Sequence, residues 1–155
     1  MAEIDGQAKP DDAVAATVQA MREGAGVIVQ GVLGEDHWYG RPDILERIDV
    51  PSALGAWAYE VADTKLSRET KAGTVLQLVF YSTLLARVQG HMPARFYVVT
   101  PEGREAYRTD DYAAYFRQVS SQLDACSRQD DATLAAANYP EPVDHCDICP
   151  WTGRS

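Results

Sequence analysis

Three charged residues, Asp43, Asp63 and Lys65, occur in segments whose apolar pattern predicts strands. Burying a charged side chain costs free energy unless a partner or ligand satisfies it. We expect Asp43 at the start of one strand and Asp63 and Lys65 at the end of the next, so that both carboxylates meet at neighbouring strand ends. Carboxylates and waters are ligands that Mg²⁺ prefers, and a lysine beside them can polarise water or neutralise charge on a phosphate. The pattern therefore indicates metal-assisted phosphodiester hydrolysis.

A solvent-facing strand end is the alternative interpretation, because charged residues are common at exposed positions. Gln77 and Tyr81 bear on this choice, since residues four apart share one face of a helix. The helix predicted over about 70–88 carries both residues, and it must pack on the sheet that carries Asp63 and Lys65. Its Gln amide and Tyr hydroxyl could orient a phosphate or a metal-bound water, or they could form a hydrogen bond that serves only the core.

These residues require a scaffold of alternating strands and helices. The periodicity predicts a helix from Asp11 to Gly24 and a long amphipathic helix over 110–137, with a third helix over about 70–88. Strands are predicted over 26–33, 37–50, 56–66 and 94–100, the first two joined by a turn at 34–36. The order α-β-β-β-α-β-α predicts an α/β fold with a mixed sheet of about four strands flanked by helices.

Length and charge limit the possible classes of protein. The 155 residues suit one domain with a hydrophobic core, which we place at 1–138, followed by a cysteine-containing tail at 139–155. A net charge of -9 argues against nucleic-acid binding by bulk electrostatics. A local basic patch could still form, or these side chains could be ordinary solvated surface: Arg41, Arg47, Lys65, Arg68, Lys71 and Arg87. No apolar run approaches the roughly 18 residues of a membrane span and no signal-peptide pattern opens the chain, so a cytoplasmic location is expected.

Three motifs follow one another in a specific order: Gly-x-x-Asp (Gly40, Asp43), Asp-x-Lys (Asp63, Lys65) and Gln-x-x-x-Tyr (Gln77, Tyr81). In this order they resemble the RecB-type branch of the PD-(D/E)xK nucleases. The resemblance to bacterial RecB-family nucleases runs from about Ala15 to the end of the chain. It rests on the segments AMREGAGVIVQGVL, WYGRPDILERI, LGAWAYEVADTKLSR and LQLVFYSTLLARVQGHMP.

The resemblance implies a restriction-endonuclease-like core and a role for each motif. Asp43 and Asp63 would hold Mg²⁺ or Mn²⁺, Lys65 would be the catalytic lysine, and Gln77 and Tyr81 would complete the pocket. Family members carry an upstream Gly-x-x-His-Glu motif that is absent between Met1 and Gly24, where the nearest candidate is Glu23. The chain therefore looks like the family without its N-terminal part.

The tail contains Cys146-x-x-Cys149 beside His145, a spacing that suits metal ligation. The resemblance implies an iron–sulfur cluster, but the third tail cysteine would fall at Ser155. Two of four ligands cannot hold a [4Fe–4S] cluster. A Zn²⁺ site would need a further ligand, for which Cys126 is an outside candidate, and free thiols are the other interpretation. A cluster or Zn²⁺ is therefore expected only if ligands come from elsewhere.

The leading hypothesis is a Mg²⁺- or Mn²⁺-dependent deoxyribonuclease domain that acts in DNA repair. Its expected partners are single-stranded DNA or duplex ends, together with a helicase or a separate N-terminal segment, and no membrane. The second hypothesis is a catalytically inactive nuclease-fold remnant that serves as a nucleic-acid-binding or scaffold module. A small zinc-binding interaction protein is a third.

Overall fold

A computed structural model describes residues 1–67 and 69–137 of the chain. The chain forms two compact units, Met1–Arg117 and Gln118–Ser155. The predicted cysteine tail at 139–155, with Cys146 and Cys149, lies outside the described residues. The account below therefore concerns the first unit and the described helices of the second.

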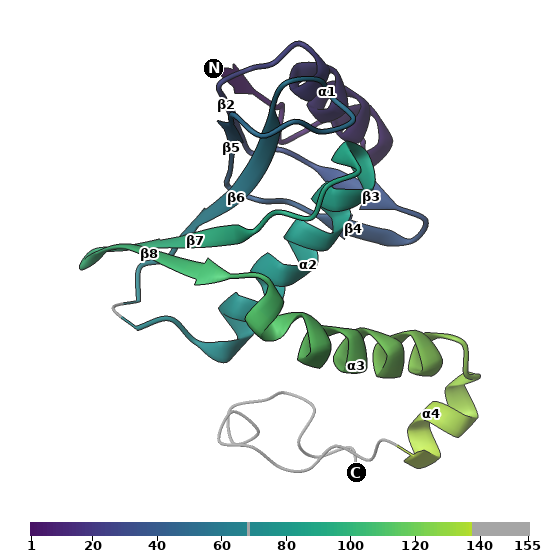
Figure 1. Cartoon of the computed structure of the whole chain (residues 1–155). Helices are drawn as coiled ribbons and strands as arrows, with labels where there is room; N and C mark the ends of the chain where they lie inside the picture. The colour runs from purple at the N-terminus through teal and green to yellow at the C-terminus, as the bar shows by residue number, and fades with distance from the viewer. Residues whose placement is uncertain (68, 138–155) are drawn as a thin grey trace. The chain divides into compact units, whose positions relative to one another are not determined.

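The first unit is built on a six-stranded mixed sheet in the order β1-β2-β5-β6-β7-β8 (Figure 1). β1–β2 and β6–β7 pair in parallel, and the remaining neighbours are antiparallel. A separate hairpin of β3 and β4 packs through its glycines against α1 and α2. The strands are β1 Ala2–Glu3, β2 Val27–Val29, β3 Leu33–Glu35, β4 Trp38–Gly40, β5 Ile44–Ile48, β6 Ala58–Thr64, β7 Arg95–Thr100 and β8 Gly103–Arg108.

The described helices are α1 Pro10–Arg22, α2 Ala72–Gln89, α3 Asp110–Ser127 and α4 Asp131–Ala137. Proline in the first turn of α1 suits a helix start, because its missing N–H would be unpaired there in any case. α2 ends at Gly90, whose φ of 64° forms the left-handed cap that glycine adopts easily. α2 also makes the crossover that parallel strands such as β6 and β7 require. Within 1–67 and 69–137, no helix combines the length and apolar content needed to cross a bilayer.

One face of the sheet forms the hydrophobic core with α1 and α2, which lie on the same side of it in Figure 1. Alternate residues of each strand point to this face, and β6 supplies Tyr59 and Val61 to it. The neighbouring strands of the sheet add Ile28, Leu45, Phe96 and Val98 to this core. Because Asp63 has the same parity as Tyr59 and Val61, its side chain also points toward the helices.

The opposite face of the sheet carries a polar network. Arg104 of β8 makes a bidentate ion pair with Glu46 of β5, at 3.0 and 2.6 Å, and its guanidinium lies 3.8 Å from the Tyr97 ring centroid. The Tyr97 hydroxyl donates to the buried Glu60 carboxylate at 3.0 Å, and the Arg95 N–H donates to the same group at 3.2 Å. The network therefore links strands that are not neighbours and leaves each Glu60 oxygen with a donor.

The α/β class and the mixed sheet are confirmed, but the sheet has six strands rather than about four. The predicted strand at 37–50 is wrong, because β4 and β5 belong to different sheets and are separated by 41–43. Pro42 lies in this gap, where its missing N–H prevents a continuous ladder. The predicted strand at 26–33 is likewise divided into β2 and β3, with Gln30 between them at a φ of 55°.

β1 and β8 were not predicted, and the predicted helix at 110–137 is divided into α3 and α4. β8 pairs with β7 along its whole length, but it is an edge strand rich in charged residues and lacks an apolar run. β1 has two residues, too few to form a pattern. The residues that separate α3 from α4 are Arg128, Gln129 and Asp130.

Candidate functional site

Asp43 immediately precedes β5, and the pairing of Ile44 with Ala62 places it beside the end of β6. Its Oδ2 atom accepts two hydrogen bonds from Thr64, one from the backbone N–H at 2.8 Å and one from the hydroxyl at 2.6 Å. The end of β6 therefore fixes the Asp43 carboxylate and occupies one of its two oxygens.

Asp63 and Lys65 stand on either side of Thr64. The Asp63 side chain is buried and forms an ion pair with the Lys65 ammonium group, which is partly exposed. The Lys65 backbone N–H donates to the Val99 carbonyl at 2.9 Å, so the pairing between β6 and β7 continues through the site. The Lys65 side chain thus leaves a fixed backbone and reaches from Asp63 toward solvent.

The carboxyl groups of Asp43 and Asp63 lie close enough together for each to shift the pKa of the other. Burial raises the pKa of Asp63, Lys65 opposes this increase, and the negative charge of Asp43 adds to it. Burial also acts to raise the pKa of Asp43, but the hydrogen bonds from Thr64 outweigh it and the pKa is lowered. Asp63 therefore holds a proton more tightly than an isolated carboxyl group would, and Asp43 less tightly.

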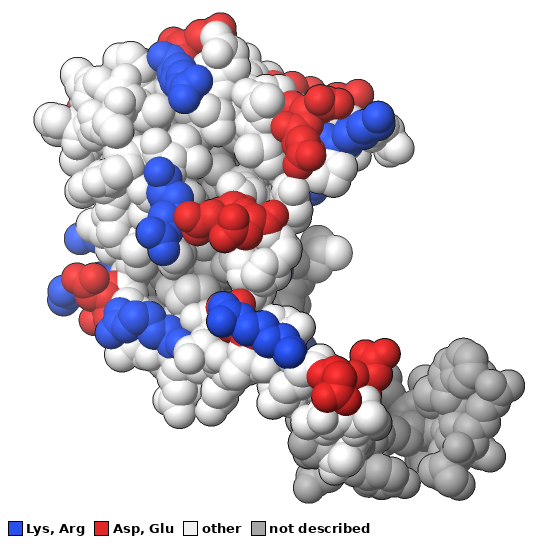
Figure 2. Space-filling model, turned by 90° about the vertical axis from the view of Figure 1, so that its right-hand side faces the viewer, with Lys and Arg blue, Asp and Glu red and all other residues white. Residues whose placement is uncertain are grey.

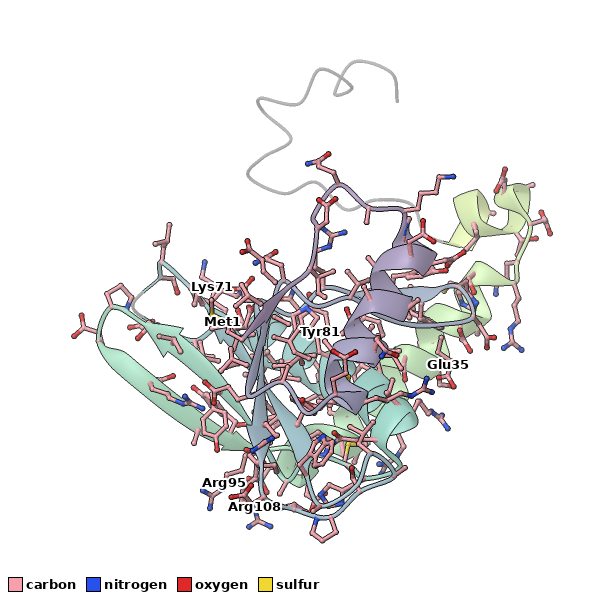
Figure 3. The ribbon with its side chains drawn as sticks, turned by 90° about the horizontal axis from the view of Figure 1, so that it is seen from above. Met1, Glu35, Lys71, Tyr81, Arg95 and Arg108 are labelled. Atoms are coloured by element: carbon pink, nitrogen blue, oxygen red, sulfur yellow. The ribbon has the colours of Figure 1, made fainter. Side chains whose placement is uncertain are left out.

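Tyr81 lies inside the fold (Figure 3), near enough to Asp63 and Lys65 for their charges to act on its pKa. Gln77 donates to that hydroxyl at 2.7 Å. Burial raises the pKa of Tyr81, the Gln77 hydrogen bond lowers it, and the Asp63 charge raises it further. The structure thus brings Asp43, Asp63 and Lys65 together and places the hydrogen-bonded Gln77 and Tyr81 within reach of their charges.

The packing around Gly40 explains why a glycine stands three positions before Asp43. A Cβ atom at Gly40 would lie 2.6 Å from Cδ1 of Tyr81 and 3.1 Å from Cδ1 of Leu84. The Tyr81 ring therefore packs directly on the backbone of β4. The glycine acts on the site by allowing α2 and Tyr81 to approach the chain just before Asp43.

Two residues of the site were not predicted, Thr64 and Gln30. Thr64 holds Asp43. Its position between Asp63 and Lys65 was the sequence feature that could have identified it as part of the site. The Gln30 backbone N–H donates to the Asp43 carbonyl at 2.8 Å, and its side-chain nitrogen lies 3.5 Å from Oδ1 of Asp43. The signal for Gln30 was a polar residue directly after the β-branched run Val27–Val29.

The two carboxylates fit a cation such as Mg²⁺, which uses one or two carboxylates and keeps several waters. In the part of the chain that the structure describes, no group of three or more His, Cys, Asp or Glu could hold a metal ion. Glu23 is exposed and accepts a hydrogen bond from Gln19 at 2.7 Å. A cation on Asp43 and Asp63 would therefore need neutral oxygen ligands as well.

Several residues of the predicted basic patch have other partners. Arg87 pairs with Glu35 at 3.3 Å, Arg47 donates to the Gly24 carbonyl at 2.9 Å, and Arg41 donates to the Gly6 carbonyl at 3.1 Å. On the face shown in Figure 2, Lys and Arg side chains are interspersed with Asp and Glu. Arg68 lies outside the described residues. Lys65 contacts the carboxylate pair directly, through Asp63.

Comparison with known proteins adds no family to this geometry. No family model matches the sequence, and no curated protein is significantly similar to it.

Proposed function

We propose that this chain is a metal-dependent nuclease domain of the RecB type, with a restriction-endonuclease-like core, that hydrolyses DNA phosphodiester bonds. The observation that carries the proposal is the pair of carboxyl groups of Asp43 and Asp63 at two neighbouring strand ends, close enough for each to shift the pKa of the other, with Lys65 bound to Asp63. The sequence of elements supports it too. α1 is followed by the antiparallel strands β2, β5 and β6, and α2 then crosses to the parallel strand β7.

The charge balance of the site favours a ligand-binding role over a purely structural one. A buried carboxylate is costly unless it is paired, and here one lysine serves two carboxylates that repel each other. A structural ion pair would need only Asp63 and Lys65. The second carboxylate is held in place by Thr64 at a cost that a bound cation would offset.

Asp43, through its Oδ1 atom, and Asp63 would hold Mg²⁺ or Mn²⁺. Such a cation, when bound, lowers the pKa of a water and stabilises the charge that develops on a phosphate. Lys65 orients the attacking water and neutralises part of that charge. The Tyr81 hydroxyl, fixed by Gln77, positions the substrate strand at the inner wall of the site.

A cleavage assay on end-labelled single-stranded and duplex DNA, with Mg²⁺ or Mn²⁺, tests the proposal. The wild-type chain should cut only with the metal, and Asp63→Asn should lower the rate by about 10²-fold or more. Asp12→Asn is the matched control, because Asp12 is an exposed carboxylate in the first turn of α1. Metal-dependent cleavage that persists in Asp63→Asn would contradict the proposal.

The alternative is a catalytically inactive nuclease-fold module that binds nucleic acid or serves as a scaffold for a helicase or a separate segment. One observation favours it, the lack of a third carboxylate or histidine beside Asp43 and Asp63 among the described residues. DNA binding without turnover by the wild-type chain, over a range of Mg²⁺ and Mn²⁺ concentrations, would select this alternative.

A further inference from the structure

Gln30 has a backbone conformation that is uncommon for its residue type. Its φ of 55° lies in the left-handed region, which among the described non-glycine residues is shared by Asp36 alone. Asp36 occupies the tight turn between β3 and β4, where such a conformation is expected. Gln30 follows β2 and lies outside that turn. Left-handed residues that are neither glycine nor part of a tight turn are concentrated at functional sites.

The contacts of Gln30 show what its conformation achieves. Its backbone N–H donates to the Asp43 carbonyl at 2.8 Å, and its amide group lies beside Oδ1 of Asp43 at 3.5 Å. The other oxygen of Asp43, Oδ2, already accepts two hydrogen bonds from Thr64. The Gln30 amide therefore stands at Oδ1, the oxygen of Asp43 that Thr64 does not occupy.

The chemistry of the amide suits a cation at that oxygen. A separation of 3.5 Å is long for an N–H···O hydrogen bond, so little is lost when the amide turns. A glutamine amide carries both a donor group and an acceptor oxygen, and rotation by half a turn would present Oε1. Amide oxygens, like carboxylates, are hard ligands of the kind that Mg²⁺ and Mn²⁺ accept.

We propose that Gln30 is the third protein group of the cation site, and that its amide oxygen binds, directly or through a water, the same divalent cation as Asp43 and Asp63. This inference rests on the proposed function, because it takes the two carboxylates to be metal ligands. It supplies the neutral oxygen ligand that two carboxylates alone lack. It also gives a reason for a glutamine at a position where glycine would be less strained.

Mn²⁺ affinity, measured by titration calorimetry on the 155-residue chain, tests the proposal apart from catalysis. Gln30→Gly removes the amide but favours the left-handed backbone, so its thermal unfolding midpoint should be unchanged or higher. Its Mn²⁺ affinity should fall about tenfold. Gln30→Glu should bind Mn²⁺ more tightly than the wild type, because a carboxylate replaces the amide oxygen. Gln19→Ala is the matched control, since Gln19 lies on α1 and bonds to Glu23.

The outcomes separate this inference from the proposed function. Wild-type Mn²⁺ affinity in Gln30→Gly, with binding lost in Asp63→Asn, would overturn the role of Gln30 and leave the carboxylate site intact. Weaker binding in Gln30→Gly and tighter binding in Gln30→Glu, without DNA cleavage by any variant, would support Gln30 and contradict the nuclease. A wild-type chain that binds no Mn²⁺ would overturn both.

Discussion

Strand β6 carries two buried carboxyl groups, which lie on opposite faces of the sheet and differ in their partners. Glu60 points to the face of the sheet away from α1 and α2, and each of its oxygens accepts a hydrogen bond, from the Arg95 N–H or from the Tyr97 hydroxyl. Asp63, three residues later, points toward the helices. It shares a single ammonium group, that of Lys65, with a second carboxyl group. One carboxyl group has a donor for each oxygen, and the other lies in a pair with excess negative charge.

The difference separates a structural carboxylate from one suited to a ligand. A buried polar group with all its hydrogen bonds made is stable without further partners. Two carboxylates that lie close together and share one lysine disfavour each other's ionisation, and a bound cation would relieve this repulsion. The Glu60 network therefore explains how the sheet is held together, and the Asp43–Asp63 pair indicates where a cation would bind.

The largest expected effect comes from exchanging each carboxylate for its amide. Asp63→Asn should abolish metal-dependent cleavage yet remain folded, because its amide can donate to Asp43. Glu60→Gln should leave cleavage near the wild-type rate but lower the free energy of unfolding by about 1–3 kcal/mol, because the new amide N–H faces a donor. Cleavage rates and urea unfolding measure both. Loss of cleavage in a fully folded Glu60→Gln variant would contradict the distinction between a structural Glu60 and a ligand-binding Asp63.

Lys65 should contribute to the reaction more than to the binding of the cation. Lys65→Met should reduce the cleavage rate by about 10²- to 10³-fold, because the charge on the phosphate loses a fixed cation. Mn²⁺ affinity measured by calorimetry should stay the same or increase, since both carboxylates remain. Lys9→Met, at the exposed residue before α1, is the matched control. If Lys65→Met lost both activity and Mn²⁺ affinity, Lys65 would be needed to build the site itself.

Gly40 offers a smaller change that acts on the site through packing. Gly40→Ala places a Cβ atom against the Tyr81 ring, so we expect a loss of about 1–3 kcal/mol in the free energy of unfolding. Cleavage should fall as well, because Tyr81 moves. Gly26→Ala is the matched control, since a Cβ there would meet nothing within 4 Å. Equal stability of the two variants would show that the Tyr81 contact is not tight.

The parts of the site that were predictable are those set by local spacing. Asp63 lies at the end of β6 and Lys65 directly after it, and Gln77 and Tyr81 share one helical face, so sequence separation alone brings each pair together. Gly40 and Asp43 were predicted from a motif that places glycine three positions before aspartate. The packing of Tyr81 on Gly40 gives the physical reason for that glycine. The α2 crossover was predictable because its apolar residues recur at helical spacing.

The parts that were not predictable depend on contacts distant in sequence. Gln30 follows β2, and the hairpin of β3 and β4 separates it from Asp43 in the sequence. The two residues meet only because the chain comes back after this hairpin, so that the Gln30 N–H bonds to the Asp43 carbonyl. β8 is specified by its pairing with β7 rather than by an apolar pattern of its own. Pro42 marked the break between β4 and β5, but the sequence did not indicate that the two strands join different sheets.

The smallest expected effect lies in the outer part of the Glu60 network. Arg104→Lys keeps the charge but loses the bidentate pair with Glu46 and the stacking on Tyr97. Because the pair is partly exposed, urea unfolding should show a loss of only about 0.5–1 kcal/mol. Mn²⁺ affinity and cleavage should not change, since Thr64 holds Asp43 independently of Arg104. A drop in Mn²⁺ affinity would mean that the two faces of β6 are coupled, and Glu60 would then have a role in positioning Asp63.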